Sequence, residues 1–290
     1  MFAVLKIKKT DSIGIFAKLL QKIKRHKIKT ELIKTPKCSY LLIVAECEDV
    51  PWDKVEAVCG RACRSIVLPR YFELPQVTFL KRFMPTALAN KVLINTCTEM
   101  IRRCHLPLYR KTVTLVDSLA AYTELVPNLL SCCITVKVVT QRQEIYKKLS
   151  YNMMEEIGAG IIVTDEFGEH DKQGDCLFVI CPDGNEAAAL DTDAPVFTLG
   201  NIDCAAKCKL VGDIKIAIRG ELSHFLPHGI DPMDFAGALY EYSGKQSFSK
   251  QTAVTLRCGR NILTPYNITE YLELKFHKPD QIYPNYTLEA

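Results

Sequence analysis

Between residues 112 and 184, short apolar runs alternate with longer segments whose apolar residues have helical spacing. Strands are predicted at four runs: 113–116, 134–139, 161–163 and 176–180. Helices are predicted over 119–130 and 143–157. Strands that alternate with helices of this length are typical of right-handed crossovers in a parallel sheet. We therefore expect residues 111–204 to form a Rossmann-like parallel-sheet domain of the α/β class.

The first 70 residues follow a different pattern. Strands are predicted at 2–8, 30–35, 40–47 and 65–68. One helix is expected to begin at Asp11 or Ser12 and to run to about His26, and Pro51 is expected to open a second. The order β-α-β-β-α-β predicts a ferredoxin-like N-terminal domain over residues 1–70.

Two further segments complete the expected organisation. Residues 71–110 are predicted to be a connecting helical segment, with a helix over 86–104 that ends before Pro107. Residues 205–290 are expected to be an irregular C-terminal extension that packs on the Rossmann-like domain. This extension includes a short helix that starts at Asp231.

Composition is that of an ordinary globular protein. Of the 290 residues, 48% are hydrophobic and 24% are charged, and no apolar run approaches the roughly 20 residues that cross a bilayer. The first lysines follow the apolar start of the chain, the reverse of a secretory signal. The 13 cysteines are scattered and odd in number, as free thiols in a reducing compartment would be. We expect a cytoplasmic protein with no membrane association.

Positive charge is concentrated at the start of the chain. Residues 1–37 carry eleven Lys or Arg against Asp11 and Glu31, although the whole chain has a net charge of only +4. The densest cluster, Lys22 to Lys29, fits either the solvated face of an amphipathic helix or a site for a polyanion. No aromatic residue interleaves this cluster, which disfavours nucleic acid as a partner.

Three short motifs relate residues 112–184 to a known superfamily. They are Gly158-Ala159 before the third predicted strand, the run GDCLFVICP at 174–182, and Thr140-Gln141-Arg142 after the second strand. On these motifs the segment resembles the Rossmann-type domains of shikimate dehydrogenases and glutamyl-tRNA reductases. The resemblance implies a cofactor site at the carboxyl ends of the strands, with Arg142 facing the 2′-phosphate of NADP.

The turn after the first strand departs from that pattern. It reads VDSLAA at 116–121, where a dinucleotide site would have glycines for close approach of the pyrophosphate. The carboxylate of Asp117 would repel this anion, so NADP binding in the standard pose is disfavoured. Asp117 and Ser118 are expected to cap the following helix instead, or to bind a ribose hydroxyl or an amine. The crevice candidates for a cofactor are Asp117, Ser118, Thr140, Arg142 and Pro182.

No catalytic residue and no metal ligand is assigned from the sequence. Cys204 and Cys208 have i, i+4 spacing, and His224 and His228 form a close pair, but neither set makes a known metal motif. A metal or redox role for the cysteine pair stays open. For the histidine pair, a packing loop is favoured over a metal site that Asp231 or Asp234 would complete. The nucleophilic cysteine of glutamyl-tRNA reductases and the lysine–aspartate pair of shikimate dehydrogenases are not recognisable here.

The absence of a phosphate loop and of a nucleophile–base pair favours a non-catalytic binding or scaffolding protein. Its ligand would be a protein partner or a small molecule, at the crevice or on the N-terminal sheet. The alternative is an NADP-dependent oxidoreductase with a nonstandard cofactor site, supported by Arg142 and the 174–182 run. A third hypothesis, binding of an acidic partner by Lys22 to Lys29, rests on charge alone.

Overall fold

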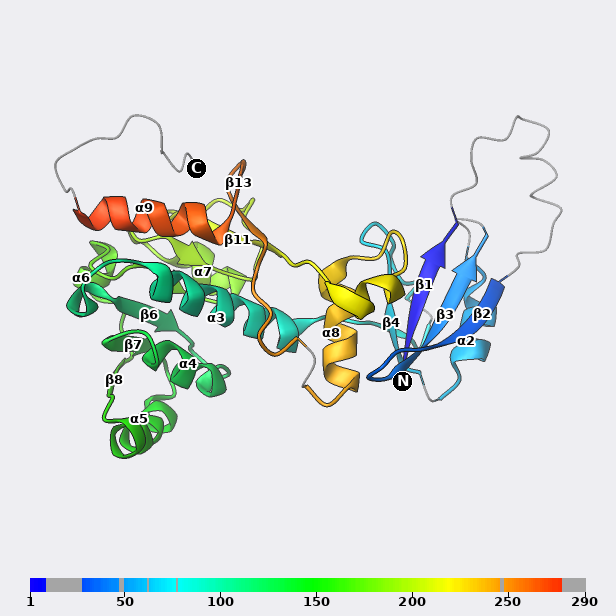
Figure 1. The fold of residues 1–290 in the computed structure, drawn as a ribbon, viewed down its shortest axis with the longest axis horizontal. Coiled ribbons are helices and arrows are strands. Elements are labelled where there is room, and N and C mark those ends of the chain that lie inside the picture. Colours follow the sequence, from blue (N-terminus) through cyan, green and yellow to red (C-terminus); the bar gives the residue numbers. More distant parts are fainter. Residues whose placement is uncertain (9–27, 47–49, 62, 77, 246–247, 278–290) are drawn as a thin grey trace. The chain divides into compact units, whose positions relative to one another are not determined.

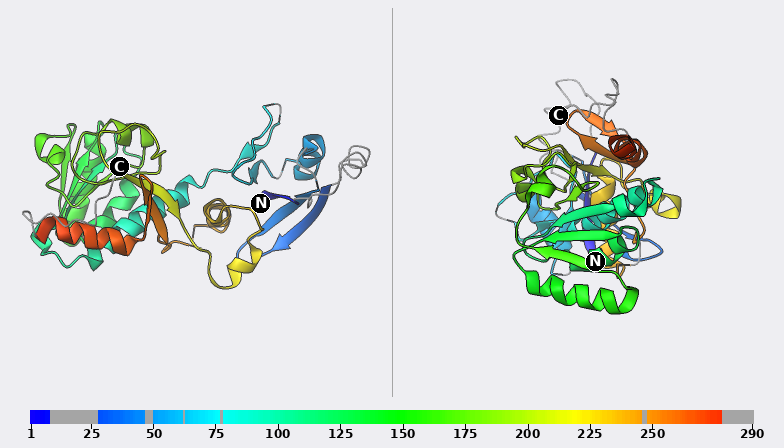
Figure 2. Two further views of the ribbon diagram at one scale, coloured as in Figure 1. Left: turned by 90° about the horizontal axis from the view of Figure 1, so that it is seen from above. Right: turned by 90° about the vertical axis from the view of Figure 1, so that its left-hand side faces the viewer.

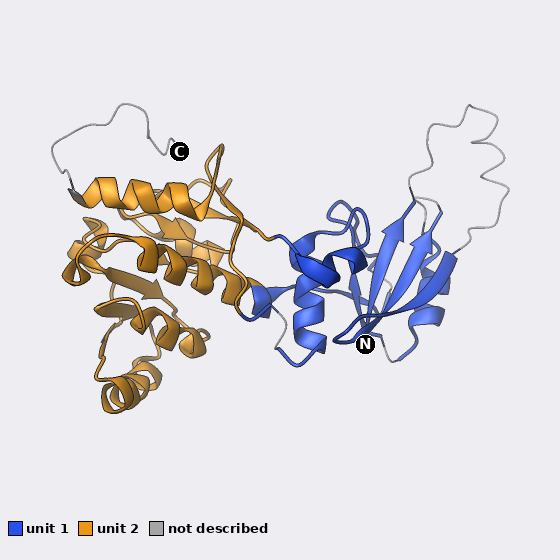
Figure 3. Cartoon of the chain, viewed as in Figure 1, with its two compact units in different colours: residues 1–88, 217–249 blue, residues 89–216, 250–290 orange. Residues whose placement is uncertain are grey.

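The computed structural model describes residues 1–8, 28–46, 50–61, 63–76, 78–245 and 248–277. The helix predicted between Asp11 and His26 lies outside these residues. The chain divides into two compact units (Figure 3). Unit 1 contains residues 1–88 and 217–249, and unit 2 contains residues 89–216 and 250–290.

The sheet of unit 1 has five strands in the order β2-β3-β1-β4-β5 (Figure 1). β1 runs parallel to both of its neighbours, β3 and β4, whereas β2 is antiparallel to β3. The elements of this unit are β1 (Phe2–Ile7), β2 (Ile28–Lys34), β3 (Ser39–Ala45), α2 (Trp52–Cys59), β4 (Ser65–Val67), β5 (Lys81–Arg82), the 3-10 helix η3 (Gly220–Phe225) and α8 (Pro232–Tyr242).

The ferredoxin-like arrangement is not confirmed. The four predicted strands are present in the expected order along the chain. In a ferredoxin-like unit, however, the first helix would join parallel strands and a hairpin would follow, so that β1 and β3 would run in opposite directions. Here β1 and β3 are parallel over six residue pairs. β1 and β2 therefore run in opposite directions, unlike the first two strands of a ferredoxin-like unit.

Both faces of the unit 1 sheet are buried at β1, which explains the continuous apolar run in that strand. Ala3 and Leu5 face a core that includes Val55 and Cys59 of α2. On the opposite face, Phe2, Val4 and Tyr40 pack against Phe235, Ala238 and Leu239 of α8. Tyr40 also donates a hydrogen bond from its hydroxyl to the carbonyl of Phe225, at 2.7 Å.

This packing corrects the expected division of the chain. Residues 217–249 were predicted to pack on the Rossmann-like domain, but they belong to unit 1. The second face of its sheet would otherwise expose aromatic surface. Contact is so close that a Cβ atom on Gly237 of α8 would lie 2.4 Å from the Cβ of Pro85. Only residues 250–277 of the described C-terminal part join unit 2.

The sheet of unit 2 has eight strands in the order β13-β12-β11-β10-β9-β6-β7-β8. β8, β7, β6, β9, β10 and β11 are parallel, and β12 and β13 form an antiparallel margin. The parallel part has the Rossmann order 3-2-1-4-5-6. The elements of unit 2 are α3 (Thr86–Arg103), η1 (Leu108–Arg110), β6 (Thr112–Val116), η2 (Thr123–Leu125), α4 (Val126–Leu130), β7 (Thr135–Val139), α5 (Gln143–Ile157), β8 (Ile161–Thr164), α6 (Glu169–Lys172), β9 (Val179–Ile180), α7 (Gly184–Ala189), β10 (Val196–Phe197), β11 (Leu210–Lys215), β12 (Thr255–Cys258), β13 (Asn261–Leu263) and α9 (Pro265–His277).

The Rossmann-type prediction is confirmed at the level of the fold. Residues on both faces of the central strands are buried, including Val116 and Val196 on one face and Leu115 and Phe197 on the other. α5 runs alongside β8 (Figure 2), and the hydroxyl of Ser150 accepts a hydrogen bond from the amide of Ile161 at 3.1 Å. None of the described helices is long and apolar enough to span a membrane.

Candidate functional site

The candidate crevice lies at the carboxyl edge of the unit 2 sheet, between β6 and β9. The chain leaves β6 toward β7 and leaves β9 toward β10, so its connections diverge at this point. Ligands of open α/β sheets bind in the crevice formed at such a switch point. The two loops that border it are 117–122 and 181–184.

Asp117 lies in the first of these loops and is only 2% exposed. Its carboxylate accepts hydrogen bonds from the amides of Ala121, at 2.9 Å, and Tyr122, at 2.8 Å. It also accepts one from the hydroxyl of Tyr146 in α5, at 2.5 Å. These amides are the ones that a phosphate at this turn would meet. Asp117 thus supplies an internal anion in the place of a ligand.

The helix predicted over 119–130 begins late because of this turn. Ala120 has a φ of 56°, a left-handed conformation that glycine adopts at lower cost. The chain then forms η2, and α-helix is present only in α4. The Asp117 carboxylate and the Ala120 backbone together replace the first helical turn.

The environment of Asp117 suppresses ionisation of its tyrosine neighbours. Burial first, and then the hydrogen bond to Asp117, raise the pKa of Tyr146. Burial and the nearby charges of Asp117 and Asp183 raise the pKa of Tyr122. Both hydroxyls therefore keep their protons at neutral pH, and Tyr146 remains a donor to the carboxylate.

Ser118, Thr140 and Arg142 lie close to Asp117 along the same edge. The amide of Gln141 donates to the carbonyl of Ser118 at 3.3 Å, which joins the loops after β6 and β7. Thr140 is buried, and its hydroxyl accepts the amide of Arg142 at 3.0 Å. Arg142 itself is exposed and immediately precedes α5. Four of the five predicted crevice residues are thus brought together.

The fifth predicted residue, Pro182, directly follows β9 and is buried. It contributes through its backbone. Its carbonyl accepts the amide of Leu199 at 3.2 Å. The next residue, Asp183, caps α7 and accepts the amides of Asn185 and Glu186 at 2.8 and 3.0 Å. The loops after β9 and β10 touch through glycines, since a Cβ on Gly200 would lie 2.1 Å from the Cα of Gly184.

Negative charge therefore surrounds the switch point. Asp117 and Asp183 each satisfy amides of the chain with their own carboxylates. Burial, followed by the charges of Glu186 and Asp183, raises the pKa of the Cys181 thiol at the end of β9. A dinucleotide pyrophosphate placed at the Asp117 turn would find its amides taken and a carboxylate in contact. The residues present do not fit that group in the standard position.

Sequence reasoning missed several of these residues. Asp183 and Glu186 match a D-x-x-E helix-start pattern that the sequence did contain. Tyr146 and Tyr122 carry no such signal, because their role depends on the distance between α5 and the β6 loop. Their contacts with Asp117 exist only in the folded chain.

The candidate metal ligands are not assembled into a site. Among the described residues, no group of three or more His, Cys, Asp or Glu side chains could hold a metal ion. Cys204 is exposed, and the thiol of Cys208 donates to the carbonyl of Ala187 at 3.5 Å. Asp231, considered as a ligand beside His224 and His228, caps α8 and pairs with Arg70 at 2.7 Å.

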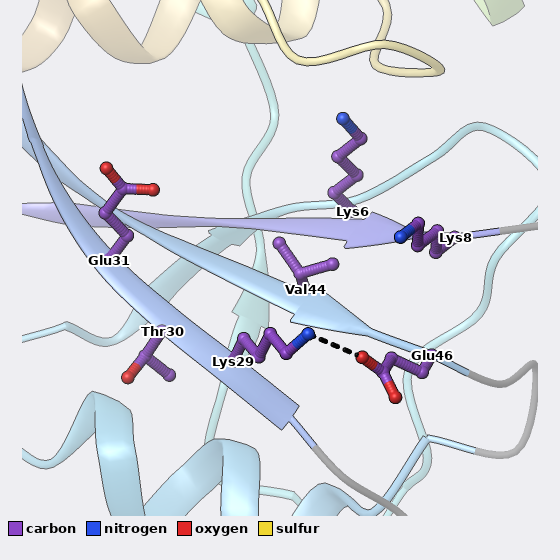
Figure 4. A pocket seen from close by; sticks show the side chains of 7 residues that line it. All are labelled: Lys6, Lys8, Lys29, Thr30, Glu31, Val44 and Glu46. Atoms are coloured by element: carbon purple, nitrogen blue, oxygen red, sulfur yellow. Dashed lines mark ion pairs between the residues drawn. The ribbon is translucent and has the colours of Figure 1, made fainter.

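Part of the basic N-terminal cluster can be placed in unit 1. Lys22 to Lys27 lie outside the described residues, and Lys29 is in β2. Its ammonium group pairs with Glu46 at 2.9 Å. Lys6, Lys8 and Lys29 line a cavity of about 650 Å³ together with Glu31 and Glu46 (Figure 4). The two carboxylates reduce the positive potential there, and binding of an acidic partner stays a prediction.

Comparisons with known proteins give structural similarities at low identity. No family model matches this chain, and no curated protein matches it. Δ1-Pyrroline-2-carboxylate reductase of Thermococcus litoralis, in complex with NADH and L-proline, is 12% identical with a TM-score of 0.28; the match covers 64% of this chain and 61% of that one. Quinate dehydrogenase of Corynebacterium glutamicum, in complex with NAD, is 7% identical with a TM-score of 0.35, covering 95% and 99%. L-Tryptophan dehydrogenase of Nostoc punctiforme is 12% identical with a TM-score of 0.27, covering 94% and 80%.

These similar structures are two dehydrogenases and a reductase, whereas the sequence predicted a non-catalytic binding or scaffolding protein. We correct that expectation and do not retain it. Its main support was the missing glycine loop, yet the strand order of a dinucleotide-binding domain is intact. The hypothesis that remains is the NADP-dependent oxidoreductase.

Proposed function

We propose that the Rossmann-like unit binds NADP in a nonstandard pose and that the protein is an NADP-dependent oxidoreductase. The observation that carries this proposal is the position of Arg142 in a sheet of Rossmann strand order. Arg142 follows β7, the second strand of that order. This strand end meets the ribose of the adenosine half in dinucleotide-binding domains.

The residues at this strand end favour a 2′-phosphate over a free hydroxyl. NAD-binding domains place an acidic residue there, and this chain has Thr140-Gln141-Arg142 instead. Arg142 is exposed, and its backbone is fixed by the hydrogen bond from its amide to the buried Thr140 hydroxyl. A guanidinium group binds phosphate through paired, charge-assisted hydrogen bonds.

The pose is nonstandard because of the turn at Asp117. The amides that would hold the pyrophosphate are bound to Asp117 itself. The dinucleotide would therefore be anchored by its adenosine end, and the nicotinamide supplies hydride chemistry when bound. Asp117, Tyr122 and Tyr146 would act as neutral or negative neighbours of the ribose rather than as phosphate ligands.

Binding measurements with NADPH and NADH test the proposal. A ligand at about 100 times its Kd adds roughly 2.7 kcal/mol to stability, enough to resolve in a thermal-shift titration. We expect a saturable shift with NADPH and a smaller one with NADH. Arg142→Ala should weaken NADPH binding about tenfold to a hundredfold and leave NADH binding unchanged.

Lys148→Ala is the matched control, since Lys148 is an exposed cation of α5, the helix that Arg142 precedes. Equal loss in both variants would mean that only general charge attracts NADPH. Absence of any shift with either dinucleotide would refute the proposed function.

A further inference from the structure

The opposite, amino-terminal edge of the unit 2 sheet holds a cluster of thiols and cations that the cofactor crevice does not use. Cys132 and Cys133 lie in the turn between α4 and β7. Cys97 belongs to α3, as does Arg102 in the last turn of that helix. Lys111 directly precedes β6. Five side chains from three separate segments thus meet at this edge.

Cys132 is the accessible thiol of the cluster. Cys97 is fully buried and Cys133 is 8% exposed, whereas Cys132 is half-buried. The Cys132 thiol points back toward α4 and donates to the carbonyl of Leu129 at 3.2 Å. The acceptor is a neutral carbonyl oxygen. This hydrogen bond does not block reaction at the sulfur, as a bound metal or a disulfide would.

Two cations are fixed beside this thiol. Arg102 donates from Nη2 to the hydroxyl of Ser131, the residue before Cys132, at 3.0 Å. The ammonium group of Lys111 is buried with its side chain 9% exposed and donates to the carbonyl of Ile101 at 3.0 Å. Neither donor is paired with a carboxylate in these bonds. Their positive charge is therefore available to a thiolate.

A hydroxyl group completes the environment. Thr98 is 5% exposed, and within the described chain its Oγ1 atom has no hydrogen-bond partner. It faces Cys132 from α3. The adjacent Cys133 thiol, the charges of Arg102 and Lys111, and the Thr98 hydroxyl together lower the pKa of Cys132 against the effect of burial. Burial and proximity to Cys132 raise the pKa of Cys97, and proximity to Cys132, followed by burial, raises the pKa of Cys133.

We propose that Cys132 is a modification site that undergoes exchange with small anionic disulfides. Its thiolate attacks one sulfur of the disulfide, a new S–S bond forms, and the original S–S bond breaks. The other half leaves as a thiolate, which takes up the proton that Cys132 released. Cys132 is oxidised to a mixed disulfide and the small molecule is reduced. Arg102 selects an anionic partner because its guanidinium is exposed at the same edge.

Glutathione disulfide is the anionic probe, and cystamine, a cationic disulfide, is its matched comparison. The full chain is incubated with each at pH 7, and modified cysteines are assigned by peptide mass spectrometry over time. We expect glutathione disulfide to modify Cys132 about tenfold faster than Cys204, although Cys204 is the more exposed thiol. Cystamine should show a smaller preference for Cys132.

Substitutions separate the role of charge from accessibility. Arg102→Gln should slow glutathione modification of Cys132 about fivefold and move its pH midpoint upward, with Cys204 unchanged. Arg103→Gln is the control, because Arg103 is an adjacent exposed cation paired with Glu99 at 2.7 Å. Circular dichroism of both variants checks that the fold is retained.

A faster reaction at Cys204 than at Cys132, or equal rates at Cys132 in wild type and in folded Arg102→Gln, would overturn the proposal. Both outcomes are independent of NADP binding, which is measured at the other edge of the sheet. A failed cofactor titration would leave this inference standing.

Discussion

Two buried aspartates of the Rossmann-like unit are held by different kinds of hydrogen-bond donor. Asp171 in α6, 4% exposed, accepts hydrogen bonds from the ammonium group of Lys137, the Thr114 hydroxyl at 3.2 Å and the Gly168 amide at 2.8 Å. Asp117, 2% exposed, accepts two amides and the Tyr146 hydroxyl. The first carboxylate is paired with a cation, whereas the two amides and the hydroxyl that bind the second are neutral.

The difference separates a structural carboxylate from one that shapes a binding site. A buried ion pair with its remaining lone pairs satisfied is part of the core, and removal of one partner leaves an isolated charge. A carboxylate held by neutral donors has no cation beside it, so it would repel an anion that entered the crevice. We therefore expect substitution of Asp117 to change what binds at the switch point, and loss of the partner of Asp171 to lower the stability of the sheet.

The largest expected effect is the loss of stability when Asp171 loses its cation. Lys137→Met would leave the Asp171 carboxylate buried without its cation and should lower the free energy of unfolding by about 3 kcal/mol. Urea denaturation measures this loss. Lys148→Met, which changes an exposed lysine, should cost less than about 0.5 kcal/mol. Similar values for the two variants would show that Lys137 does not stabilise the core through Asp171.

Asp117→Asn should lower the free energy of unfolding by a smaller amount and should strengthen NADPH binding. Loss of the charge weakens three hydrogen bonds, and one donor loses its acceptor, which should cost about 2 kcal/mol in unfolding free energy. Removal of negative charge from the crevice should also tighten NADPH binding, as measured by calorimetry. Asp183→Asn, a conservative change of an exposed cap, should change stability by less than about 0.5 kcal/mol. Weaker NADPH binding to Asp117→Asn would contradict our account of the crevice.

The hydrogen bond from the Tyr146 hydroxyl to Asp117 makes the stability of the protein sensitive to alkali. The pKa of Tyr146 is raised in the folded state, so its contribution is fully present below the ordinary tyrosine pKa of about 10 and is lost as the pH rises above it. Tyr146→Phe should cost about 1.5 kcal/mol at pH 7 and flatten the alkaline loss of stability. The control is Tyr151→Phe on the same helix, where the side chain is 73% exposed. If Tyr146→Phe lost stability at alkaline pH as steeply as the wild type does, another group would be the cause of that loss.

The smallest expected effect concerns the backbone of the Asp117 turn. Ala120→Gly relieves a left-handed alanine and should stabilise the protein by about 0.5 kcal/mol, after the entropy cost of glycine is subtracted. Ala121→Gly, one residue later and without a positive φ, should destabilise it by a similar amount. Thermal denaturation of the pair tests the sign. If both variants lose stability, the strain at Ala120 is not significant.

Local pattern predicted the elements of this protein well. The strands β6, β7 and β8 and the helices α3 and α5 lie within one or two residues of their expected positions. Two elements differ from expectation. The first helix of the Rossmann-like domain is shortened by the Asp117 turn, and the strand predicted at 176–180 is reduced to β9, Val179–Ile180. Of the crevice, the sequence indicated Asp117, Ser118, Thr140, Arg142 and Pro182, but not Tyr146, Tyr122 or Asp183.

The sequence alone determined the alternation of strands and helices, the missing glycine loop and the basic residue after the second strand, since each depends on near neighbours in the chain. Only the tertiary structure decided that β1 runs parallel to β3, that residues 217–249 return to the first unit, and that Asp117 accepts a hydrogen bond from Tyr146. These features depend on contacts between residues far apart in sequence. Such contacts form wherever they bury the most apolar surface and satisfy the buried polar groups, and hydrophobic periodicity carries no record of which segments will meet.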